Sequence, residues 1–234
     1  MIYKPEVVSA NIVALGAFNP AIFTPDWLLS NGLIGEGEAE SIRQSKNIVI
    51  THQITVLEGV TFVLQVEEEK FQLTCKGVVT PALRDLAAGV FELLPHTPLT
   101  ALGLNFDTLF RFFDAAAYHR VGDVLAPKEI WAKIYPQEKH AIGLQNLVVK
   151  VQAGSRDDGA STRDCKNISI QPGVTDYQSI RFTYNDHRDI AERAVHGRLQ
   201  AEVAADVLRS DWELAWLEST KTVADILGMA TVEI

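Results

Sequence analysis

The spacing of apolar residues predicts both strands and helices in the first half of the chain. Strands are expected where apolar and polar residues alternate, and these segments are residues 7–18, 48–56, 60–66, 71–75 and 100–106. Helices are expected after Thr24 and Thr80, because each precedes a proline and a threonine–proline pair caps and starts a helix. The pattern places His52 on the apolar side of its strand. Asn105 interrupts an apolar strand and therefore needs hydrogen-bond partners if it is buried.

The second half is expected to hold three strands followed by helices. The strands are residues 143–153, 165–171 and 177–185, and the polar loop 155–164 is expected to be the most mobile segment because it has little to bury. One helix is expected from about residue 190 to 209. A second is expected after it, because Ser210-Asp211-Trp212-Glu213 fits a capping box and Gly228 offers an end.

This order of elements predicts an α+β fold. Strands and helices do not alternate regularly, as they would in a doubly wound sheet, so we expect a mixed or antiparallel sheet, or sheets, packed by helices on one face. The chain is expected to form two stacked β-rich halves and a helical C-terminus. The expected parts are residues 1–113, a connecting segment with a short helix at 114–138, and residues 139–234.

Composition and charge limit the classes of function. The chain has 234 residues and a net charge of −9, and it lacks the basic tracts that broad nucleic-acid binding requires. No apolar run approaches the ~20 residues needed to span a bilayer, and the N-terminus does not resemble a signal peptide. Two cysteines are too few for a disulfide scaffold. We therefore expect a cytoplasmic protein that binds neither membranes nor nucleic acid directly.

Motifs that carry chemistry are weak throughout the sequence. The acidic segment 35–40 lacks the third glycine of a phosphate-binding loop and is expected to be a solvated connection. Cys75 is a candidate nucleophile only if a histidine such as His52 lies beside it. The six histidines are scattered, without the close spacing of metal ligands. The sequence therefore nominates no catalytic residue, no cofactor and no metal ligand.

The C-terminal helices carry the best candidate for a protein contact. Its residues recur at helical spacing and include two tryptophans four positions apart; they are Trp212, Trp216, Val223 and Leu227. Such a stripe packs on the protein's own sheet or docks another protein, and interfaces are enriched in tryptophan.

One region resembles a known group of proteins. Residues 18–27, taken with Leu83-Arg84-Asp85-Leu86 and with His96-Thr97-Pro98 through Asn105, resemble a scattered family of bacterial proteins of unknown function. The resemblance covers about the first 110 residues. It implies a bacterial origin and, more loosely, the accessory proteins found beside defence or mobile-element genes. It implies no activity, ligand or catalytic residue.

Together these features favour a non-enzymatic protein-binding adaptor or regulator that uses its acidic surface and C-terminal helices. Two alternatives from other classes stay open. A hydrolase or nucleotide-responsive enzyme would require His119, Asp123, His140 and Asp186 to converge between the two halves. A small-ligand sensor would require a pocket between the sheet and the helices.

Overall fold

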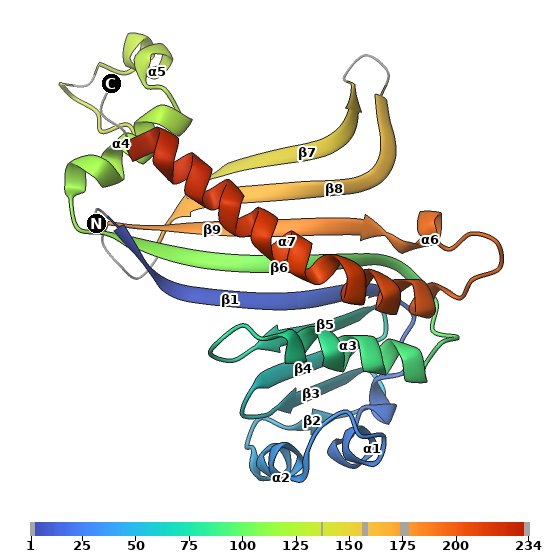
Figure 1. The fold of residues 1–234 in the computed structure, drawn as a ribbon. Coiled ribbons are helices and arrows are strands. Elements are labelled where there is room, and N and C mark those ends of the chain that lie inside the picture. Colours follow the sequence, from blue (N-terminus) through green and yellow to red (C-terminus); the bar gives the residue numbers. More distant parts are fainter. Residues whose placement is uncertain (1–2, 137, 156–158, 174–177, 232–234) are drawn as a thin grey trace.

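The computed structural model contains one antiparallel sheet of nine strands (Figure 1), and it describes residues 3–136, 138–155, 159–173 and 178–231. The strands are β1 (Tyr3–Gly16), β2 (Val49–Ile50), β3 (Ile54–Glu58), β4 (Phe62–Glu67), β5 (Lys70–Cys75), β6 (Leu99–Phe112), β7 (Leu147–Ser155), β8 (Gly159–Pro172) and β9 (Ser179–Asp189). Their order across the sheet is β2-β3-β4-β5-β1-β6-β9-β8-β7.

The helices lie mainly on one side of this sheet, where α3 and α7 contact each other (Figure 1). They are the 3-10 helix η1 (Pro20–Ile22) and the helices α1 (Pro25–Ser30), α2 (Glu36–Gln44), α3 (Pro81–Leu93), α4 (Ala115–Leu125), α5 (Glu129–Ile134), α6 (Ile190–Arg193) and α7 (Gln200–Thr231). The α+β class predicted from the sequence is confirmed. No helix in the described part of the chain is long and apolar enough to cross a membrane.

The two faces of the sheet differ in polarity. On β1, Ala10, Ile12 and Ala14 are fully buried toward the helices, whereas the alternate residues Ser9 and Asn11 are only partly buried. Successive side chains of a strand point to opposite faces, so this alternation gives one apolar face under the helices and one polar face away from them. We call the second surface the polar face.

The two halves of the chain lie side by side in this sheet. Strand β6 pairs with β1 along one side and with β9 along the other, so the hydrogen-bonded ladder is continuous from the first half to the second. Phe106 of β6 lies at this junction and packs edge-on against Trp212 and Trp216 of α7, at ring-centre distances of 5.1 and 5.2 Å. A single buried core therefore joins both halves.

Two predictions for the first half are wrong. The strand expected at 48–56 is a hairpin of β2 and β3, and His52 lies in its exposed turn, where the Oγ1 of Thr51 accepts hydrogen bonds from the backbone N–H of Gln53 and Ile54. The segment expected as a connection at 35–40 starts helix α2, with Gly35 as its N-cap. Acidic residues suit a first helical turn because they face the positive end of the helix dipole.

The second half also departs from expectation. Helix α7 runs without a break through Ser210 and Gly228, because Leu208, Trp212 and Ala215 keep one face buried across the expected capping box. Residues 159–164 belong to strand β8 rather than to a mobile loop, and residues 156–158 lie outside the described residues. The helices predicted after Thr24 and Thr80 are confirmed, although the Thr80 side chain makes no cap hydrogen bond.

Candidate functional site

Strand β7 forms one edge of the sheet and is paired along one side only. Within the described ranges it pairs with β8, from Leu147 opposite Ile170 to Gln152 opposite Cys165, and it stands last in the strand order. An unpaired edge presents a row of backbone N–H and C=O groups that can pair with a strand from another chain.

The side chains of β7 are unusually apolar for an exposed edge. Val148, Val149 and Val151 are 59, 42 and 48% exposed, and because they alternate in direction, both faces of the strand carry an apolar group. Lys150 is the one charged residue of β7. The register is regular from Leu147 and shifts between Gln152 and Gly154, which leaves residues 147–151 as a regular stretch clear of the shift. We call these residues the β7 edge.

Next to this edge, the polar face carries four asparagines aligned across four strands. Asn11, Asn105, Asn185 and Asn167 stand directly opposite one another on β1, β6, β9 and β8. Their side chains form one hydrogen-bonded chain, in which Nδ2 of Asn105 donates to Asn11 Oδ1 (2.8 Å), Nδ2 of Asn185 to Asn105 Oδ1 (2.5 Å) and Nδ2 of Asn167 to Asn185 Oδ1 (3.2 Å). We call this set the asparagine row.

The asparagine row is a specific arrangement because asparagine is depleted in strands. A Cβ at Gly103 would lie 3.0 Å from Asn185 Nδ2 and 3.4 Å from Asn105 Nδ2, so a side chain at this position would crowd the amides of the row. Beside the row, Thr183 Oγ1 donates to Asp107 Oδ1 at 2.5 Å. The row thus gives the polar face a neutral surface of amide donors and acceptors.

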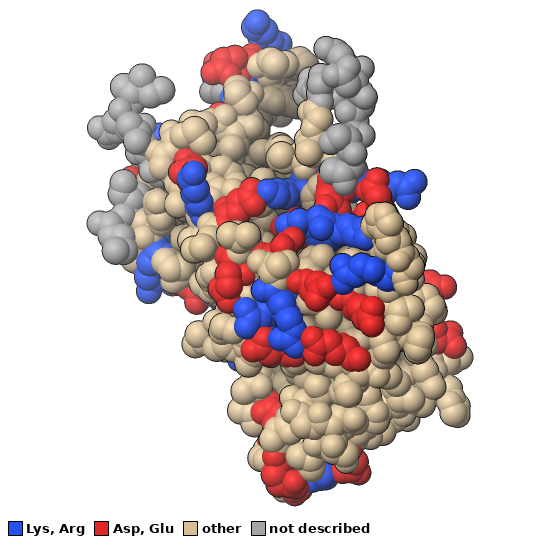
Figure 2. Space-filling model, turned by 45° about the vertical axis from the view of Figure 1, so that its right-hand side comes forward, with Lys and Arg blue, Asp and Glu red and all other residues tan. Residues whose placement is uncertain are grey.

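On the opposite face, a network of ion pairs fastens α6 and α7 to β8 and β9. Arg188 donates from Nε and Nη2 to the two oxygens of Asp186 (2.9 and 2.7 Å), and its Nη1 lies 3.0 Å from Asp211 of α7. Lys166 pairs with Glu218 of α7 and Arg193 with Asp164. Figure 2 shows acidic and basic side chains intermixed over this side of the molecule.

These contacts shift the ionisation of the groups involved. Burial opposes the charged form of Asp164, but hydrogen bonds from the Arg193 side chain and the Asp189 backbone outweigh it and lower the pKa of that carboxyl. Burial likewise opposes the charge on Arg188, but Asp186 outweighs it and raises the guanidinium pKa. Burial, with the charges of Glu218 and Asp186, raises the pKa of Tyr184 above its ordinary value. These shifts keep Asp164 and Arg188 charged, and Tyr184 neutral, at neutral pH.

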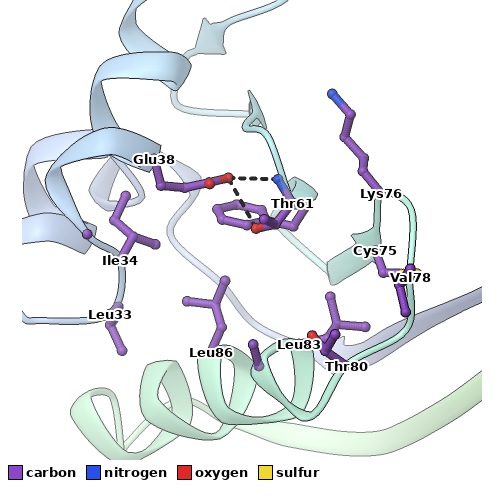
Figure 3. Close-up of a pocket in the computed structure, with 13 residues that line it drawn as sticks. Leu33, Ile34, Glu38, Thr61, Cys75, Lys76, Val78, Thr80, Leu83 and Leu86 are labelled. Carbon is purple, nitrogen blue, oxygen red and sulfur yellow. Dashed lines mark hydrogen bonds between the residues drawn. The ribbon is translucent and has the colours of Figure 1, made fainter.

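A hollow of about 430 Å³ opens between α2, the start of β4, the end of β5 and α3 (Figure 3). Its walls are mainly apolar, formed by Leu33, Ile34, Phe62, Leu83 and Leu86. Glu38 reaches across it, and its Oε1 accepts from the backbone N–H and the Oγ1 of Thr61 at 3.1 and 3.3 Å. Lys76 points away from the hollow, and its Nζ binds Glu58 at 2.8 Å.

The predicted protein-contact residues lie inside the molecule. Trp212, Val223 and Leu227 are buried by at least 94%, and Trp216 is partly buried over Phe106. This stripe packs on the protein's own sheet, so it offers no free surface to a partner. The same helix exposes Leu214 and Leu217 on its outer side.

The four residues required by the enzyme alternative do not meet at one place. His119, Asp123 and His140 line one open hollow beside α4, where Asp123 pairs with Lys128 at 2.6 Å. Asp186 instead lies buried under Arg188 on β9. In the part of the chain that the structure describes, no group of three or more His, Cys, Asp or Glu residues could hold a metal ion.

The structure separates Cys75 from the histidine that a nucleophilic thiol would need beside it. Cys75 is buried, and its Sγ accepts the backbone N–H of Ala10 at 3.1 Å, while His52 lies away from it in the β2–β3 turn. Cys165 stands opposite His187 on the polar face, a neighbour that only the strand register reveals.

Comparison with protein-family models found no match to this chain, and comparison with curated proteins found none either. A function therefore has to be argued from the sites themselves, since a fold by itself does not imply one. Sequence reasoning missed the β7 edge and three members of the asparagine row. Asn105 alone gave a signal, through its need for hydrogen-bond partners, and these partners are Asn11 and Asn185.

Proposed function

We propose that this chain is a non-enzymatic protein-binding adaptor or regulator whose contact surface is the β7 edge. The observation that supports this proposal is a regular five-residue stretch at the end of the strand order, residues 147–151, with three exposed valines. Proteins usually protect such an edge with charges, prolines, bulges or a covering element. Here Lys150 is the one charged residue of the strand and the register shifts only after Gln152, so residues 147–151 can accept a partner strand.

Strand addition fits this edge energetically. Main-chain hydrogen bonds to an added strand supply affinity, and side chains that alternate along the strand supply specificity. Val148, Val149 and Val151 would each lose exposed apolar surface, at roughly 25 cal/mol per Å² buried. The edge therefore favours an extended segment of another protein, with apolar residues facing these valines.

The resemblance of the first 110 residues extends the proposal to a biological setting. It supports an accessory protein of bacteria, encoded beside defence or mobile-element genes, and such proteins often work by binding partners. The enzyme alternative is less favoured, because Asp186 is held by Arg188 rather than placed with His119, Asp123 and His140.

The test is co-purification of the tagged chain with the products of its neighbouring genes. We expect a partner at near-stoichiometric yield with the unchanged chain, and its loss with Val149→Lys, which places a charge within the contact. Val60→Lys is the matched control, because Val60 is also an exposed valine, at 62%, but lies in the β3–β4 turn. Full recovery with Val149→Lys would place the contact elsewhere.

The small-ligand alternative is favoured by the hollow of Figure 3. Apolar walls together with the Glu38 carboxylate suit a ligand that has an apolar body and a positive charge. We expect octylamine, but not octanoate, to raise the melting temperature, and Glu38→Gln to abolish the difference. Equal shifts with both compounds would contradict a specific site.

A further inference from the structure

We infer that the strand that adds to the β7 edge is β7 of a second copy of this chain, so that two nine-stranded sheets join into one. This inference rests on the proposed function of the edge and names the partner. The assembly would be a symmetric dimer, in which the same residues contribute from both copies.

The geometry follows from a twofold axis that passes through Val149, perpendicular to the sheet. Two β7 strands then pair antiparallel, and their polar faces stay on the same side. In this register Leu147 stands opposite Val151 of the other copy, Val149 opposite Val149, and Val148 opposite Lys150. Residues directly opposite one another have Cβ atoms roughly 4.5–5.5 Å apart.

This register makes the edge its own complement. On the helix side of the sheet, Leu147, Val149 and Val151 of one copy face Val151, Val149 and Leu147 of the other, which gives three apolar pairs. On the polar face, Lys150 stands over a valine rather than over its symmetry mate, so like charges are not directly opposite. Helix α7 contacts β6 and β9 of the sheet, further in from this edge.

Charge distinguishes a second copy of this chain from a basic partner. Each copy carries a net charge of −9, so association of two copies is opposed by long-range repulsion that salt screens. The dimer should therefore tighten several-fold between 20 and 300 mM NaCl. A complex with a basic protein would instead weaken over this range.

The first experiment measures mass by light scattering after size exclusion, from about 1 to 200 µM. This range is chosen because one strand pair buries less than the roughly 1,600 Å² of a standard interface, so the affinity is expected to be modest. We expect the mass to rise from 25.8 kDa toward twice that value. Val149→Lys should remain at 25.8 kDa at every concentration, and Val60→Lys should dimerise normally.

A second variant tests the register itself. Val149→Cys places two thiols directly opposite each other at the axis, so mild oxidation should convert most of the chain into a covalent dimer. Val148→Cys, whose counterpart is Lys150, and the unchanged chain with Cys75 and Cys165 should give much less. Equal crosslinking of the two variants would overturn the register.

The outcomes separate this inference from the proposed function. If the unchanged chain stays monomeric while its edge binds another protein, the second copy is wrong and the adaptor proposal stands. If the chain dimerises and Val149→Lys dimerises equally well, the interface lies elsewhere and the inference is overturned. Circular dichroism melting shows whether each variant is folded.

Discussion

The two edges of the sheet are built in opposite ways. Strand β2 has two residues and is followed by a tight turn, whereas β7 has nine residues and three exposed valines. Near β2, helices α1 and α2 add further contacts, and Ile42 of α2 is fully buried in the core. The short edge offers little to another strand, and the long one offers a regular template.

Electrostatics reinforce this contrast. Arg43 on α2 pairs with Asp26 of α1 at 2.6 Å and with Glu36 and Glu40 of its own helix, and these carboxylates raise its pKa. This end of the molecule is thus closed by contacts within the chain. At the other end, the ion pairs lie inward of β7, between β8, β9 and α7, and leave the outermost strand uncovered. The edge at β2 is therefore stabilised by contacts within the chain, whereas the edge at β7 is left accessible to a partner.

The largest expected loss of stability comes from a core residue near β2, and it contrasts with a small loss from a side chain of the β7 edge. Ile42→Ala should lower the free energy of unfolding by about 2–5 kcal/mol, because it leaves a cavity between α2 and the sheet. Val148→Ala should cost less than about 1 kcal/mol, because that side chain is mostly exposed. Urea unfolding measures both. Similar losses of unfolding free energy would show that Val148 of the β7 edge contributes to stability as much as a core residue does.

The next effect concerns the β3–β4 turn at the closed end. A Cβ at Gly59 would lie 2.0 Å from Oε1 of Glu38, so Gly59→Ala should displace that carboxylate from Thr61. The expected loss is roughly 1–3 kcal/mol for the broken hydrogen bonds. Gly37→Ala is the control, since its Cβ meets nothing within 4 Å, and it should stabilise α2 by about 0.5–1 kcal/mol. Thermal melting should therefore show a lower melting temperature for Gly59→Ala and a higher one for Gly37→Ala.

A smaller effect is expected on the polar face, beside the open edge. Asn105→Ala removes two contacts of the asparagine row and should cost about 1 kcal/mol, whereas Asn167→Ala removes one and should cost about half as much. Chemical denaturation of both variants measures the difference. Equal losses of unfolding free energy, or none, would mean that the hydrogen bonds of the asparagine row do not contribute to stability one by one.

The smallest expected effect is the pH dependence of stability that Asp164 of β8 contributes. Because the pKa of Asp164 is lowered in the folded state, its contribution to stability is complete above its unfolded pKa, about 3.9, and is lost as the pH falls below that value. Asp164→Asn should therefore lower the melting temperature by a few degrees at pH 7–9 and change it little at the acid end, which flattens the acid limb of the profile. Asp225→Asn, at an exposed position of α7, serves as the control.

Local patterns predicted those parts of the fold that local forces decide. The Thr24 cap is an example, since its Oγ1 accepts the N–H of Trp27 at 3.0 Å as the sequence leads one to expect. Ser210 carries an equally good cap pattern, yet tertiary burial of Leu208, Trp212 and Ala215 keeps the helix continuous. A local capping pattern is thus overridden here because the helix gains more by continuing one buried apolar face.

The candidate site depends on strand order, which the sequence does not display. The segment at 143–153 reads as a strand, but nothing in its residues shows that it is the last strand of the sheet. The asparagine row likewise joins residues 11, 105, 167 and 185, and their alignment exists only once β1, β6, β9 and β8 are in register. The tryptophan stripe fits either a partner or the protein's own sheet, and only the tertiary structure shows that it packs on the sheet.

The asparagine row also has a direction. Each amide donates toward β1, from Asn167 through Asn185 and Asn105 to Asn11, so the carboxamide dipoles add rather than cancel. The sum resembles a short helix dipole laid across the strands, positive over β1 and negative over β8, where Lys150 stands opposite Asn167. Two sheets joined at β7 would place both negative poles at the axis between them. The Lys150 side chains of both copies would stand beside these poles, which would offset part of the repulsion between the two ammonium groups.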